Sequence, residues 1–169
     1  GHIEQRGMGV VSKYTVGMAI FYAPGFLMGH LHAKLGGWTT DGYTLPYRLW
    51  MQLGVMAYFF IGLWVLRKLL LRYAGEWSVA MVLVALGLGT NLFYYVIVDP
   101  GMPHATLFMA VTWLMHFSIK FYERPGWGYS SMLALTASLI CLVRPNHVIL
   151  WAIPMLYGVH SLSSAKERM

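Results

Sequence analysis

The run WSVAMVLVALGLGTNLFYYVIV, residues 77–98, decides the fold class of this chain. It contains no charged side chain, and about 20 apolar residues in a helix are enough to span the hydrocarbon core of a bilayer. The sequence DPGMPH, residues 99–104, follows at once, and its two prolines and glycine do not continue a helix. The pattern therefore predicts a membrane-spanning helix that ends at a tight loop.

Five further charge-poor runs surround this one and give the same indication. They lie between basic clusters and Pro/Gly turns and cover residues 14–35, 49–72, 105–122, 127–143 and 146–162. The first is predicted either to span the membrane or to lie at its interface, because a proline such as Pro24 ends or kinks a helix. We expect an all-α, polytopic transmembrane bundle of four to six helices.

The last two runs are separated because residues 127–162 are too long for one span. A single helix there would measure about 54 Å, against a hydrocarbon core of about 30 Å. Arg144-Pro145-Asn146 is expected to divide it. Residues 1–169 are expected to form a single transmembrane region, and since the chain begins without Met, we interpret it as an internal piece of a longer protein.

The composition excludes other classes of protein. Only 11% of residues are charged and 58% are hydrophobic, whereas a soluble domain carries roughly 25% charged residues. Disorder requires low hydrophobicity, so it is excluded as well. The net charge of +6 does not indicate a nucleic-acid partner, because the basic residues flank the apolar runs. Cys141 is the single cysteine and excludes an internal disulfide framework.

The distribution of Lys and Arg predicts the orientation. If all six runs span, nine of the 12 basic residues share one side, which the positive-inside rule makes cytoplasmic. If residues 14–35 only lie at the interface, the count becomes seven to five with the same orientation. In either case most of the unusual polar residues gather on the outer side, namely Asp41, Arg48, Asp99, His104, Arg144, Asn146 and His147.

Arg144 is the most informative of these residues. It is the only charge between residues 127 and 162, and such a charge is costly in a membrane unless it is paired or near water. Two interpretations stay open, because a guanidinium suits phosphate oxygens but also reaches the interface from a helix end. Asp99 and His104 bracket the tight loop. They could bind a hydroxyl, a phosphate or a metal, or simply cap the turn.

Two shorter patterns lie in the first apolar run. His30 and His32 do not face one another on a helix and have no third ligand at zinc spacing, so we assign no metal site. The sequence GFLMG, residues 25–29, matches the small-xxx-small pattern of helix contacts in membranes.

Several patches resemble one family in their order and spacing. They are KYTVG (13–17), DGYTLPY (41–47), GLWVLRK (62–68), GTNLFYY (89–95) and LVRPN (142–146). Together they resemble bacterial integral membrane glycosyltransferases of the C-type (GT-C) superfamily. These are relatives of the protein O-mannosyltransferases and of the lipid A aminoarabinose transferase.

The resemblance implies a multi-pass protein of the bacterial inner (cytoplasmic) membrane. Such an enzyme transfers a sugar from a polyprenyl-phosphate carrier to an acceptor on the extracytoplasmic face. Its main catalytic carboxylate would lie upstream of residue 1, so no catalytic residue is assigned here, and a divalent metal requirement stays open. The substrate-binding candidates are Arg144, Asn146, His104, Asp99 and Arg48.

One departure from the family pattern concerns His104. Pro103 precedes it where the resemblance leads us to expect a small hydroxyl residue, which puts the role of His104 in question. A piece of a transporter and a non-catalytic membrane subunit are the alternatives. Transporters place polar groups near the bilayer midplane, whereas here such groups cluster at one edge, which favours an enzyme.

Overall fold

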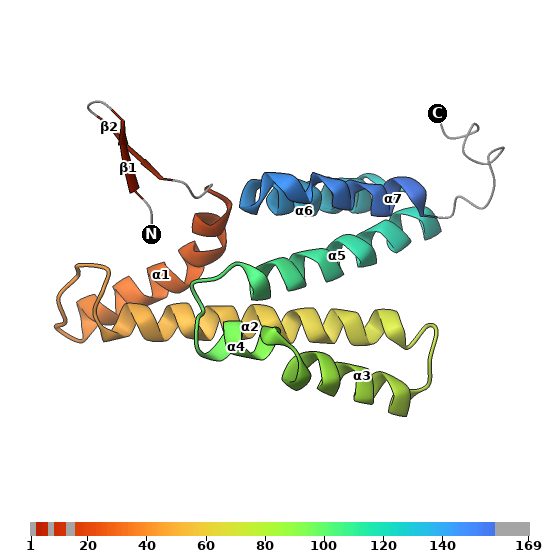
Figure 1. Ribbon diagram of the computed structural model, residues 1–169, viewed down its shortest axis with the longest axis horizontal. Helices are drawn as coiled ribbons and strands as arrows, with labels where there is room; N and C mark the ends of the chain where they lie inside the picture. The colour runs from red at the N-terminus through yellow and green to blue at the C-terminus, as the bar shows by residue number, and fades with distance from the viewer. Residues whose placement is uncertain (1–2, 7–8, 13–15, 158–169) are drawn as a thin grey trace.

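The structure is a computed structural model that describes residues 3–6, 9–12 and 16–157 (Figure 1). A short antiparallel hairpin of β1 (Ile3–Arg6) and β2 (Gly9–Ser12) stands at the start of the chain. Helices form the rest, which confirms the all-α prediction. They are α1 (Gly17–Leu35), α2 (Leu45–Leu70), α3 (Glu76–Gly89), α4 (Asn91–Ile97), α5 (His104–Glu123), α6 (Trp127–Val143), the 3₁₀ helix η1 (Pro145–Trp151) and α7 (Ala152–Leu156).

Helix α5 lies at the centre of the bundle. It packs against α2 on one side and against α6 on the other, while α3 and α4 lie along α2 (Figure 1). Its buried face contains the hydroxyl residues Thr106, Thr112 and Ser118. Each hydroxyl donates to a carbonyl about one turn earlier in the chain, those of Pro103, Met109 and Leu114, at 2.9, 2.7 and 2.6 Å respectively. These polar side chains are therefore buried without leaving a hydrogen-bonding group unsatisfied.

Helices α1 and α2 pack with their backbones very close together. A Cβ on Gly25 would lie 2.9 Å from the carbonyl oxygen of Trp50, and one on Gly29 would lie 2.8 Å from Cα of Tyr47. Both glycines of the 25–29 pattern thus face α2, as the small-xxx-small pattern predicts. Helix α1 also runs through Pro24 without ending, so this run forms one continuous helix.

The run 77–98 is not one helix, and this prediction was also wrong. Helix α3 ends at Gly89, α4 begins at Asn91, and the two axes differ by 60°. Thr90 between them has an extended backbone, and its Oγ1 accepts a hydrogen bond from the N–H of Leu92 at 3.2 Å. The threonine thus caps a new helix.

The run 127–162 divides where the sequence predicted. Helix α6 ends at Val143 and η1 begins at Pro145, as expected for a residue without an N–H. The prediction of an α-helix over 146–162 was wrong, because this segment forms a 3₁₀ helix followed by only five α-helical residues. Pro154 removes another backbone donor there. Residues 158–162 lie outside the described residues.

Only part of the predicted membrane pattern is visible in the described residues. Helix α2 alone is long and apolar enough to cross a membrane, and the bent pair α3–α4 would make a second span if it counts as one. Helix α6 is apolar but shorter, with 17 residues. Only 22% of the apolar window of α2 is buried in the structure, whereas the core helix of a soluble protein would be mostly buried.

Candidate functional site

The ionisable residues of three segments meet at the end of the bundle where α5 begins. His104 is the first residue of α5, Asp99 lies in the loop after α4, and Arg144 and His147 lie at the junction of α6 and η1. The charges of all three residues influence the pKa of His104. We call His104, Asp99, Arg144 and His147 the His104 cluster. It arises because α5 and α6 are antiparallel neighbours, so the start of one lies beside the end of the other.

The ring of His104 is held by an aromatic contact. It stacks on the ring of Tyr95 of α4, with centroids 4.0 Å apart and an interplanar angle of 23°. The imidazole is half-buried. Its pKa lies below the ordinary value of 6.5, first because burial disfavours the charged form and then because Arg144 and His147 repel a proton, while Asp99 opposes the shift. His104 is therefore neutral at neutral pH and offers one donor and one acceptor.

Three helices fix the loop that carries Asp99. The hydroxyl of Tyr22 on α1 donates to the carbonyl of Pro100 at 2.8 Å. The side-chain amide of Gln52 on α2 donates to the carbonyl of Val96 in α4. Within the loop, the N–H of Met102 donates to the carbonyl of Asp99 at 3.2 Å. The position of the loop thus depends on α1, α2 and α4 together.

Arg144 occupies the break between α6 and η1. Its N–H donates to the carbonyl of Ile140 at 3.0 Å, and its carbonyl accepts from the N–H of His147 at 3.0 Å, so the backbone is fixed on both sides. The side chain is half-buried, and no carboxylate of the described residues forms an ion pair with it. A guanidinium in this setting is available to an anion.

The remaining polar residues that the sequence analysis placed on the outer side are Asn146, Arg48 and Asp41. Asn146 is exposed beside it, and its Oδ1 lies 3.2 Å from Nδ1 of His147. Arg48 is exposed on the first turn of α2, and no contact of the described residues joins it to the cluster. Asp41 caps its own turn, because its Oδ1 accepts from the N–H groups of Tyr43 at 2.8 Å and Thr44 at 3.2 Å.

Two residues of this site, His147 and Tyr22, were not among the substrate-binding candidates of the sequence analysis. His147 follows Arg144 by three residues, which is the spacing of one 3₁₀ turn, so the Pro145 break was the available signal. Tyr22 had no such signal, because it lies 78 residues before Pro100 in the chain.

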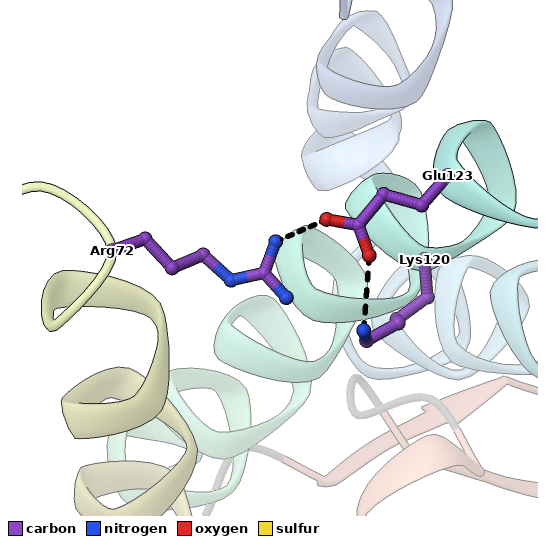
Figure 2. A network of polar contacts seen from close by, with 3 residues as sticks. All are labelled: Arg72, Lys120 and Glu123. Atoms are coloured by element: carbon purple, nitrogen blue, oxygen red, sulfur yellow. Dashed lines mark hydrogen bonds and ion pairs between the residues drawn. The ribbon is translucent and has the colours of Figure 1, made fainter.

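The opposite end of the bundle contains a different set of charges. Glu123 accepts from Arg72 at 2.5 Å and from Lys120 at 2.9 Å, which joins the end of α5 to the turn after α2 (Figure 2). Since α5 begins at His104 and ends at Glu123, these two residues are about 30 Å apart along that helix. The placement of Asp99, His104 and Arg144 on the membrane face opposite Arg67, Lys68 and Arg72 stays a prediction.

His30 and His32 of α1 each contact a side chain of α2. Nδ1 of His30 lies 2.7 Å from the hydroxyl of Tyr47, and Nδ1 of His32 accepts from the indole of Trp50 at 3.2 Å. His116 of α5 has a buried Nδ1 without a partner among the described residues. No group of three or more His, Cys, Asp or Glu side chains in the described part of the chain could hold a metal ion.

Comparisons with known proteins add no family to this description. No family model, no curated protein and no solved structure matches the chain.

Proposed function

We propose that this chain is part of a multi-pass membrane glycosyltransferase that takes a sugar from a polyprenyl-phosphate carrier on the outer face of a bacterial inner membrane. The single observation that carries the proposal is the placement of Arg144, His104 and Asp99 at one end of the bundle, at the end of α6, the start of α5 and the loop before α5. The family and the carrier come from the resemblance in the sequence patches described above.

The exposure of apolar side chains supports the membrane part of the proposal. Helix α3 is almost wholly apolar, yet Met81, Val84 and Leu88 are 66%, 59% and 68% exposed. An apolar surface of this extent is unfavourable in water and favourable in lipid. We therefore retain four to six membrane helices as a proposal, with α3 and α4 forming one bent span.

The chemistry of the His104 cluster supports the phosphate part. When a sugar leaves a lipid phosphate, negative charge develops on the phosphate oxygens, and positioned donors stabilise that charge. Arg144 supplies a planar pair of donors, and neutral His104 supplies one more. Asp99 is then placed to orient His104 or an acceptor hydroxyl, while Asn146 adds an amide at the exposed edge. Arg48 would join only if the first turn of α2, which carries it, moved toward the cluster.

A direct test measures binding of a short-chain polyprenyl phosphate to the chain in detergent, with the corresponding polyprenyl alcohol as the ligand control. We expect the phosphate to bind more tightly than the alcohol, and Arg144→Ala to remove most of this difference. Arg67→Ala is the matched variant, because Arg67 lies at the opposite end and pairs with Glu76 at 3.6 Å. Equal binding of phosphate and alcohol by the wild-type chain would contradict the proposal.

A piece of a transporter is the second candidate, and the 60° break between α3 and α4 is the observation that favours it. Broken helices in transporters expose backbone groups to a substrate near the bilayer midplane. In this chain the carbonyl of Leu86 at the break accepts from the hydroxyl of Thr90 at 2.7 Å. If the chain is a transporter, Thr90→Val should impair ligand binding more strongly than Arg144→Ala does. The glycosyltransferase proposal predicts the opposite order.

A further inference from the structure

A groove lies at the end of the bundle opposite the His104 cluster, between α5, α6 and the η1–α7 segment. Its volume is 280 Å³. The walls come from the last turn of α5, the first half of α6, Trp151, Pro154 and Met155. In this part of the molecule α5 packs against both α6 and α7, and α6 packs against η1 (Figure 1).

The polar side chains that line the groove direct their donor hydrogens to groups within the chain. The hydroxyl of Tyr122 donates to the carbonyl of Pro154 at 2.8 Å, and the hydroxyl of Ser130 donates to the carbonyl of Gly126 at 3.0 Å. The indole N–H of Trp151 donates to Sγ of Cys141 at 3.2 Å. The other lining side chains are hydrocarbon or thioether. The lining of the groove therefore favours a ligand that is apolar along its length.

The surroundings of the groove are cationic. The loop that joins the two lining helices begins at Arg124, which is exposed and has no ion pair among the described residues. Lys120 directly precedes the lining residue Phe121 and shares Glu123 with Arg72 (Figure 2). Arg124, Lys120 and Arg72 are positively charged and Glu123 is negatively charged. The end of the bundle beside the groove therefore has a net positive charge.

We infer that this groove binds one acyl chain of an anionic phospholipid whose phosphate lies at Arg124. The volume of 280 Å³ equals the liquid volume of about nine water molecules, and a methylene is of similar size, so about half of a common acyl chain fits. Basic residues beside a membrane attract anionic lipids. This inference rests on the membrane location in the proposed function but not on glycosyl transfer or on the His104 cluster.

The test is native mass spectrometry of the full chain released from detergent after incubation with phosphatidylglycerol or phosphatidylcholine of the same acyl composition. We expect the wild-type chain to retain more phosphatidylglycerol than phosphatidylcholine. Ala134→Phe fills the groove from α6 and should abolish retention of both lipids. Ala85→Phe is the matched control, because Ala85 is exposed on α3 away from the groove.

A second variant tests the headgroup without changing the groove. Arg124→Gln should keep the acyl chain bound but reduce the preference for phosphatidylglycerol by about fivefold, as expected for one basic residue near a lipid surface. Circular dichroism of every variant checks that the helices are intact. If Ala134→Phe retains as much lipid as Ala85→Phe, or if the wild-type chain retains both lipids equally, the inference is overturned. Retention of phosphatidylglycerol by Arg124→Gln at the wild-type preference would also overturn it.

Discussion

The contact between α1 and α2 gives the sharpest prediction about stability. We expect Gly29→Ala to destabilise the chain, although alanine is ordinarily the better helix former. The new Cβ would lie 2.8 Å from Cα of Tyr47 and 3.2 Å from the carbonyl oxygen of Pro46. Because carbon atoms prefer a separation of at least about 3.5 Å, α1 would have to move away from α2 by about 0.7 Å.

The magnitude follows from two opposing terms. Overpacking costs about 1–3 kcal/mol, and the upper value applies because the obstacle is the backbone of a neighbouring helix and not a mobile side chain. Replacing glycine by alanine within a helix returns about 1 kcal/mol. The net loss is therefore about 2 kcal/mol, which lowers the Tm of a chain of this size by about 4–8 °C.

Thermal unfolding of the chain in detergent, followed by far-ultraviolet circular dichroism, measures this shift. Gly54→Ala in α2 is the matched control, because a Cβ there meets nothing within 4 Å. The control should gain about 1 kcal/mol from the same helix propensity and melt higher by about 2–4 °C. If Gly29→Ala melts as high as Gly54→Ala, the close packing of α1 on α2 is refuted.

Three further predictions concern charged residues. In a transfer assay on the full-length enzyme, Arg144→Ala should lower turnover about a hundredfold and Arg144→Lys should rescue it poorly, because the guanidinium pairs with phosphate in a plane; near-normal transfer by well-expressed Arg144→Ala would remove Arg144 from the site. The pKa of His104 is held below 6.5 by burial first, so the unfolded chain binds its proton more readily and stability should fall as the pH drops below that value; in pH-dependent melts, His104→Gln should lose less Tm over this range than the wild-type chain. The pKa of Glu123 is lowered from 4.5 by hydrogen bonds from Lys120 and then Arg72, so the ionised carboxylate stabilises the fold above pH 4.5 and this stabilisation is lost as the pH falls below that value. If Glu123→Gln shows the same fall of Tm at acid pH as the wild-type chain, this prediction is contradicted.

The helices that the sequence predicted well are those with local boundary signals. Pro145 divided the last run correctly, because a residue without an N–H interrupts a helix whatever surrounds it. The 25–29 glycine pattern likewise predicted a close helix contact. The break at Thr90 was missed because the run 77–98 contains no proline, and the side chain of Thr90 and the tertiary contact from Gln52 to Val96 set it.

The same distinction between local signals and tertiary contacts applies to the candidate site. Asp99 and His104 were recognised from a turn that is local in sequence. The placement of Arg144 near the start of α5 depends on the antiparallel packing of α5 and α6. Counting membrane crossings predicts only that Arg144 and His104 share one face of the membrane, and it does not predict that their helices are neighbours. The hydrogen bond from Tyr22 to Pro100 could not be predicted, because no local pattern joins residues so far apart in the chain.

The central claim is that the His104 cluster and the opposite end of the bundle, where Arg72 pairs with Glu123, lie on opposite faces of a membrane. Cysteine accessibility labelling tests it, with Asp99→Cys and Lys68→Cys placed separately in a Cys141→Ala background and a membrane-impermeant maleimide applied to intact cells or inverted vesicles. The account predicts that position 99 is labelled from the outside and position 68 only in inverted vesicles. Labelling of both positions from the same side would contradict it.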